Sequence, residues 1–306
     1  MRQRNVGRSG LAVSVVGLGC NNFGWRLEEA ASRAVVDAAI EAGITLFDTA
    51  ESYGDGLSEE FIGRAIAGRR DQVVIATKFG WGRGFGDNDV ARGSAAYVRD
   101  AIERSLRRLG TDYVDLYQYH RPDGVTPIEE TLAALDELVR EGKVRWIGSS
   151  NFSAQQVREA DRVSAEQALA AFVSAQNGYS WLDREAEAEL LPACEEIEIG
   201  FIPCFPLARG LLTGKYGRRE SWPAGTRLPQ GSGVTGEQWA RIERLDSFAR
   251  ERDVTLLDVA IGGLAAQPAV CSVIAGASTP EQVRANAAAG AWEPTPGELE
   301  VLQGLW

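Results

Sequence analysis

The feature that most constrains this chain is an alternation of apolar, strand-like segments with amphipathic, helix-like segments along its whole length. The expected strands are residues 13–20, 45–50, 72–79, 113–120, 144–151, 172–179, 199–207 and 270–278. Helical periodicity lies between them, for example at 27–43, 95–110 and 127–142, which end on Gly43, Gly110 and Gly142. The pattern predicts eight strands and at least seven linking helices.

The expected strands are continuous apolar runs, which indicates burial on both faces, and regular strand–helix alternation requires a parallel sheet. Eight such units predict an α/β fold of the (β/α)8 TIM barrel type, in a single domain over residues 1–306. The alternative is an open, doubly wound sheet. However, GLGCNNFG at 17–24 lacks the G-x-G-x-x-G spacing that opens the first helix of dinucleotide-binding folds of that kind.

Composition excludes several classes of partner. The chain has 43 acidic and 32 basic residues and a net charge of -11, which opposes binding to nucleic acid or to an anionic membrane surface. No apolar stretch approaches the roughly 18 residues of a membrane span, so no membrane association is expected. The scattered cysteines Cys20, Cys194, Cys204 and Cys271 indicate free thiols and a cytoplasmic location. No oligomeric state is predicted.

One long segment has no regular period. Residues 213–236 are rich in glycine, proline and basic residues. Long irregular loops in compact domains are usually functional. We expect this segment to act as a lid or ligand clamp.

Polar side chains follow three consecutive expected strands. Asp48, Lys78 and His120 lie at the ends of the second, third and fourth strands, and Tyr53 lies in the loop after the second. Each alone is compatible with a structural role as a cap, a rim charge or a packed ring. In a barrel, however, the carboxyl ends of neighbouring strands meet at one rim, where catalytic groups lie. The four side chains are therefore expected to converge.

A converging Tyr, Lys, Asp and His suits the reduction of a carbonyl group. Hydride addition develops negative charge on oxygen, which a site must neutralise with a proton and aimed donors. We expect the ammonium of Lys78 to lower the pKa of the Tyr53 phenol, Asp48 to hold Lys78, and His120 to orient the carbonyl. Because the chain contains 1 histidine, no three-histidine metal site is possible and no metal is predicted.

These segments resemble the aldo-keto reductase superfamily over nearly the whole chain. FDTAESYG at 47–54, TKFG at 77–80 and YQYH at 117–120 are similar to the segments that carry that family's catalytic residues. The resemblance implies Asp48, Tyr53, Lys78 and His120 as the catalytic set, with Tyr53 as proton donor and NADPH as hydride donor. It also implies that a hairpin around GRSGL at 7–11 closes the bottom of the barrel.

The resemblance further implies a cofactor site built from barrel loops. Ser150, Asn151 and Gln176 would bind the nicotinamide carboxamide, residues 205–216 the pyrophosphate, and residues 276–286 the adenosine end. The full predicted set is Cys20, Asn21, Asp48, Ser150, Asn151, Gln176, Cys204, Phe205, Pro206, Leu207, Arg209, Gly210, Lys215, Arg227, Gly276, Ser278, Gln282 and Asn286.

Two positions depart from the pattern of related sequences. Cys204 stands where an aromatic side chain commonly stacks on the nicotinamide, and Phe205 is the expected substitute. Ser278 and Gln282 stand where basic residues often contact the 2′-phosphate of NADPH, so Arg227 or Arg284 is expected to supply that charge. NADPH is the favoured cofactor, and NADH stays open.

The substrate is expected to be a small carbonyl compound. Trp25, Trp81 and Trp181 follow strands and would line its pocket together with Tyr53 and His120. Two other functions stay open. One is a nicotinamide-binding regulatory subunit with little turnover, because some proteins of this superfamily attach to ion channels. The other is a phosphate-binding barrel lyase or isomerase that needs no nicotinamide.

Overall fold

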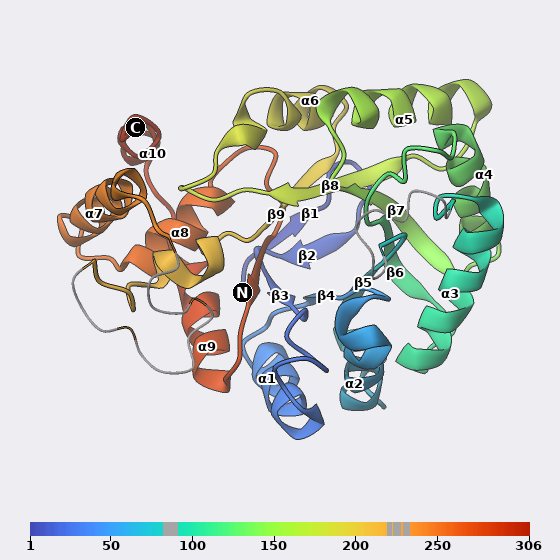
Figure 1. The fold of residues 1–306 in the computed structure, drawn as a ribbon, viewed down its shortest axis with the longest axis horizontal. Helices are drawn as coiled ribbons and strands as arrows, with labels where there is room; N and C mark the ends of the chain where they lie inside the picture. Colours follow the sequence, from blue (N-terminus) through green and yellow to red (C-terminus); the bar gives the residue numbers. More distant parts are fainter. Residues whose placement is uncertain (82–90, 219–221, 223–227, 229–232) are drawn as a thin grey trace.

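The computed structural model describes residues 1–81, 91–218, 222, 228 and 233–306. Its main sheet has eight parallel strands in the order β10-β3-β4-β5-β6-β7-β8-β9. Phe201 of β9 completes the ring, because its N–H donates to Ala269 O at 2.7 Å and its carbonyl accepts from Cys271 N–H at 3.0 Å. The structure confirms the predicted (β/α)8 barrel (Figure 1).

Each expected strand contains one strand of the barrel. The strands are β3 (Val16–Gly19), β4 (Leu46–Asp48), β5 (Val74–Phe79), β6 (Val114–Tyr119), β7 (Val144–Ser150), β8 (Phe172–Gly178), β9 (Gly200–Cys204) and β10 (Val273–Gly276). The helices are α1 (Glu29–Glu41), α2 (Leu57–Ala65), α3 (Ala95–Leu109), α4 (Ile128–Arg140), α5 (Ala154–Gln167), α6 (Leu190–Glu196), α7 (Gly236–Arg250), α8 (Leu256–Ala265), α9 (Pro280–Ala289) and α10 (Pro296–Gln303).

The helices cover the outside of the ring with their apolar faces (Figure 1). α3 shows why the sequence folds this way. It begins at the cap Ser94, whose hydroxyl accepts from Tyr97 N–H, and it ends at Gly110 in the left-handed conformation, as its sequence predicts. Its buried positions, such as Val98 and Ile102, recur at helical spacing and pack into the main core.

A two-stranded antiparallel hairpin precedes the barrel. It consists of β1 (Gln3–Asn5) and β2 (Ala12–Ser14). Val6, Leu11 and Val13 pack against residues from inside the ring, among them Leu116 and Ile202. The hairpin therefore closes one end, and the expected strand over 13–20 divides at Val15 between β2 and β3.

The opposite end of the ring, where the strands finish, carries the polar residues. Along the register, Gly19 pairs with Asp48, Lys78 with Gln118, and Ser150 with Gln176. Because these positions come at the carboxyl ends of their strands, their side chains and the loops that follow share one rim. Within the described ranges, no helix has the length and apolar character needed to cross a membrane.

Candidate active site

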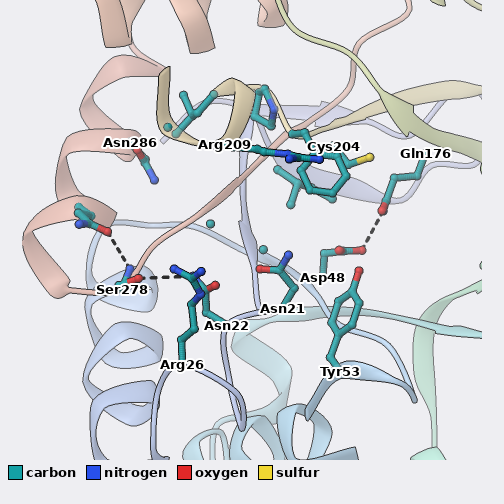
Figure 2. Close-up of a pocket in the computed structure, with 18 of the residues that line it drawn as sticks. Asn21, Asn22, Arg26, Asp48, Tyr53, Gln176, Cys204, Arg209, Ser278 and Asn286 are labelled. Carbon is teal, nitrogen blue, oxygen red and sulfur yellow. Dashed lines mark hydrogen bonds between the residues drawn. The ribbon is translucent and has the colours of Figure 1, made fainter. Parts of the chain in front are cut away.

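A cavity of about 770 Å³ opens at the carboxyl ends of the strands (Figure 2). Many of the predicted site residues line it, from the loops after nearly every strand. These residues are Asn21, Asp48, Tyr53, Trp81, His120, Ser150, Asn151, Gln176, Cys204, Phe205, Pro206, Leu207, Arg209, Gly210, Lys215, Gly276, Ser278, Gln282 and Asn286. The cavity is large enough for an extended ligand.

A buried ion pair forms the floor at one end of the cavity. The Nζ of Lys78 lies 2.7 Å from the carboxylate of Asp48 and donates to Thr49 O at 2.9 Å. Asp48 also accepts from the amide of Gln176 at 2.8 Å and from that of Gln118 at 3.4 Å. Although burial lowers the pKa of Lys78, Asp48 and Tyr53 raise it further, so the net pKa is above its ordinary value. Lys78 therefore stays charged.

Tyr53 points into the cavity from the loop after β4, next to this ion pair (Figure 2). Its hydroxyl lies 3.5 Å from Lys78 Nζ. Gly54 follows with φ of +57°, and a Cβ there would lie 2.7 Å from Phe23 O, so the tight turn requires glycine. Glu51 anchors the same loop, since its carboxylate accepts from Gly80 N–H and from Tyr97 Oη, each at 2.8 Å.

The acidity of Tyr53 corrects one expectation from the sequence. Burial raises the pKa of Tyr53 to about 12, and the opposing effect of Lys78 is smaller. We expected Lys78 to lower this pKa below its ordinary value, and that expectation is wrong for the net effect. The loss of hydration on burial outweighs the attraction of the phenolate to Lys78. At neutral pH Tyr53 therefore holds its proton and can donate it.

His120 lies on the other side of Tyr53. The two rings meet edge to face with centroids 5.8 Å apart, and Trp81 packs on His120 at 4.8 Å. Burial, and then the nearby Lys78 ammonium, lower the pKa of His120 well below its usual value. The imidazole is therefore neutral. Asn151 holds the segment in place by donating its side-chain amide to His120 O at 2.9 Å.

The loop after β9 lines the cavity in strained backbone geometry. Phe205, Ala208 and Arg209 have φ values of +58°, +45° and +60°, and Gly210 follows at +100°. Non-glycine residues in this region each cost on the order of 1–3 kcal/mol and cluster at ligand clamps. Phe205 is 52% exposed on the cavity wall.

Burial raises the pKa of the Cys204 thiol to about 12, so Cys204 is not a thiolate at neutral pH.

The far end of the cavity is formed by the loop after β10 and by the start of α9. Ser278 N–H donates to the side chain of Gln282 at 2.8 Å, and Thr279 caps the helix by accepting from Gln282 N–H. From the neighbouring loop after β3, the side-chain amide of Asn22 donates to Ser278 Oγ at 3.4 Å (Figure 2). Two loops far apart in sequence therefore meet here.

Four predicted residues lie outside the cavity lining, and a fifth lies outside the described residues. Trp181 is fully buried, and its indole donates to Val259 O at 2.9 Å, so it is part of the core and does not line the cavity. Trp25 is 63% exposed and outside the cavity lining. Cys20 is buried with its thiol near Leu18 O. Arg284 pairs with acidic side chains away from the cavity. Arg227 lies outside the described residues, as does part of the expected 213–236 lid.

The cavity also has lining residues that the sequence did not identify. They are Gly19, Asn22, Arg26, Ser52, Thr213, Leu257, Ile274 and Ala285. Asn22 and Arg26 belong to the polar loop that follows β3. Two consecutive asparagines immediately after a barrel strand, Asn21 and Asn22, were the available signal.

Comparison with known proteins gives a consistent result. The model of the Aldo/keto reductase family matches residues 15–305. The Uncharacterized oxidoreductase YrpG of Bacillus subtilis (strain 168) is 37% identical over 295 residues, which cover 93% of this chain and 89% of that protein. A Probable voltage-gated potassium channel subunit beta of Oryza sativa subsp. japonica is 36% identical, with coverage of 94% and 90%. The Versiconal hemiacetal acetate reductase of Aspergillus parasiticus is 30% identical, with coverage of 99% and 96%.

Proposed function

Since the chain belongs to the aldo/keto reductase family, a family of oxidoreductases, we propose that it reduces an aldehyde or ketone to an alcohol with NADPH as cofactor. The observation that carries the proposal is the cluster at the cavity floor. A protonated phenol, a buried ammonium and a neutral imidazole lie together beside one opening.

The residues of the cavity fit a nicotinamide dinucleotide. Asp48 is the one carboxylate among the described lining residues, whereas Arg26, Arg209 and Lys215 also line the cavity. In the described part of the chain, none of these three cations has a carboxylate partner. Unpaired cations in a protein of net charge -11 favour an anionic ligand, such as a pyrophosphate. When bound, the nicotinamide would supply the hydride.

The four floor residues have distinct roles in this proposal. Tyr53 donates its proton to the carbonyl oxygen as negative charge develops there. Lys78 lies within 3.5 Å of the phenol oxygen and stabilises the phenolate that remains, while Asp48 fixes the ammonium in place. A neutral His120 orients the carbonyl oxygen by donating a hydrogen bond from one ring nitrogen.

Cofactor and substrate occupy neighbouring parts of the cavity in this proposal. Ser150, Asn151 and Gln176 would hold the carboxamide, and Phe205 would take the place of a stacking aromatic at Cys204. The strained loop and the two cations Arg209 and Lys215 would hold the pyrophosphate. Trp81 would line the substrate end, next to Tyr53 and His120. Trp181 drops out of the proposal because it is buried in the core.

The relative from rice raises a second candidate, a nicotinamide-binding regulatory subunit with little turnover. Steady-state oxidation of NADPH in the presence of a panel of aldehydes and ketones separates the two. We expect substrate-dependent turnover well above the rate without substrate. Tight NADPH binding with no turnover on any carbonyl would favour the regulatory role. Absence of binding to either NADPH or NADH would refute both.

A further inference from the structure

The most unexpected group in the cavity is Arg26. It comes from the loop after β3, beside the loop after β10 and the start of α9, because β3 and β10 are neighbouring strands (Figure 2). The guanidinium packs over the ring of Trp25 at 4.6 Å. Among the residues that the structure describes, it has no carboxylate partner. An exposed cation held on an aromatic ring is available to an incoming anion.

The backbone of the loop fixes where Arg26 lies. Asn22 O accepts from the N–H groups of Arg26 at 2.8 Å and of Leu27 at 3.0 Å, and Gly24 N–H donates to Leu27 O at 3.0 Å. These bonds form a tight turn. Since the Asn22 side chain contacts Ser278 at 3.4 Å, the same turn places Arg26 at the Ser278 end of the cavity.

A second observation points to a ligand at this end. Asn22 is 6% exposed, yet its Oδ1 has no hydrogen-bond partner within the described ranges. A buried polar atom without a partner is costly unless something satisfies it. The start of α9, a helix of 10 residues, faces the same end of the cavity through Gln282, where the helix dipole favours negative charge.

Arg284, the other described cation considered for this position, does not lie there. Arg284 lies 3.7 Å from Glu41 and 3.8 Å from Glu281, and it does not line the cavity. Ser278 and Gln282 carry no charge, and they already bond to each other at 2.8 Å. A phosphate group placed here needs a cation, because an unpaired phosphate is costly to desolvate. Arg26 is the described lining residue at this end that can supply one.

We propose that Arg26 binds the 2′-phosphate of NADPH, at the Ser278 end of the cavity, and thereby sets the preference for NADPH over NADH. This inference rests on the proposed function, because it assumes that the dinucleotide lies with its adenosine end between the loop after β3 and α9. Asn22 would accept a hydrogen bond from the same ligand through its Oδ1. Specificity would then come from the first strand–helix loop and not from the loop after β10.

The test measures binding directly, with two ligands that differ only in the phosphate. Titration calorimetry with 2′,5′-ADP and with 5′-AMP would be done on the wild type, Arg26→Ala, Arg26→Lys and a control, Arg284→Ala. We expect Arg26→Ala to weaken 2′,5′-ADP binding roughly ten- to hundredfold, the usual effect of losing hydrogen bonds to a charged group. Arg26→Lys should restore part of the affinity. The control should bind both ligands as the wild type does.

The remaining outcomes distinguish an error in the assignment of Arg26 from an error in the proposed function. If the wild type binds NADPH but Arg26→Ala retains full 2′,5′-ADP affinity, the assignment of Arg26 is wrong while the proposed function stands. The same conclusion follows if Arg284→Ala loses that affinity. If the wild type prefers NADH, both the assignment of Arg26 and the choice of NADPH are wrong, while carbonyl reduction stands. If the wild type binds neither NADPH nor NADH, the proposed function itself fails. Thermal melting of each variant would show that loss of binding is not loss of folding.

Discussion

The two ends of the cavity differ in how far the protein itself satisfies their charges. At the floor, Lys78 and Asp48 are fully or almost fully buried, and their charged groups lie 2.7 Å apart. Two glutamine side-chain amides donate further hydrogen bonds to the carboxylate of Asp48. Away from the floor, Arg26, Arg209 and Lys215 line the cavity without carboxylate partners among the described residues.

This contrast predicts that substitutions in the two regions have different effects. The floor is organised before any ligand arrives, as expected of groups that must meet a developing charge with little rearrangement. In the proposed function, the charges of the cation-lined part are neutralised only when an anionic ligand binds, so these cations contribute to ligand affinity. Substitutions at the floor should therefore change stability and chemistry. Substitutions along the cation-lined part should change binding.

The largest effect on stability is expected from Lys78→Met. Removing one partner of a buried ion pair leaves a buried, uncompensated carboxylate, which typically costs about 3–5 kcal/mol. Urea unfolding would measure the change. Lys143→Met is the matched control, because that side chain pairs with Glu103 at 2.7 Å while the two side chains are 35% and 46% exposed, and surface pairs contribute little. Equal losses in the two variants would contradict the account of the floor.

An intermediate effect, confined to binding, is expected from the double variant Arg209→Ala/Lys215→Ala. NADPH affinity should fall roughly ten- to hundredfold and lose much of its salt dependence, because two charge-assisted contacts are removed. The free energy of unfolding should hardly change, since neither cation has a carboxylate partner within the described residues. Arg158→Ala, which breaks an exposed pair with Glu196, serves as the control. A large loss of stability in the double variant would contradict the proposed difference between the floor and the cation-lined part of the cavity.

A smaller effect concerns pH. Burial, and then Lys78, hold the pKa of His120 well below its ordinary value of about 6.5. Below about pH 6.5 the unfolded chain therefore binds a proton that the folded chain does not, so folding stability falls with pH by up to about 1.4 kcal/mol per pH unit. The free energy of unfolding of the wild type and of His120→Gln, measured at pH 7 and pH 5.5, isolates the contribution of His120. We expect the variant to lose less stability than the wild type; equal losses would place a charged imidazole in the site.

The barrel and the convergence of its rim were accessible from sequence because both follow from chain order. Continuous apolar strands alternating with helices leave few architectures, and parallel strands carry their end residues to the same rim. This is why the side chains of Asp48, Tyr53, Lys78 and His120 could be expected to gather before any coordinates were considered.

The features that the sequence did not predict depend on how deeply a side chain is buried and on which way it points. Trp181 follows a strand as Trp81 does, yet its indole turns into the core and bonds to Val259 O. The net pKa of Tyr53 is set by its burial, which the motif does not encode. Arg26 lies in a polar loop without a period, and only the turn around Asn22 brings it to the cavity.

The central claim is that Tyr53 is a protonated proton donor, and that the ion pair of Lys78 and Asp48 beside it forms without it. The most direct test is Tyr53→Phe, with NADPH binding and carbonyl reduction measured on the same preparation. We predict that turnover falls roughly 10²- to 10⁴-fold, the usual contribution of a general acid, while NADPH affinity and the melting temperature stay close to wild type. Turnover close to that of the wild type would contradict the account.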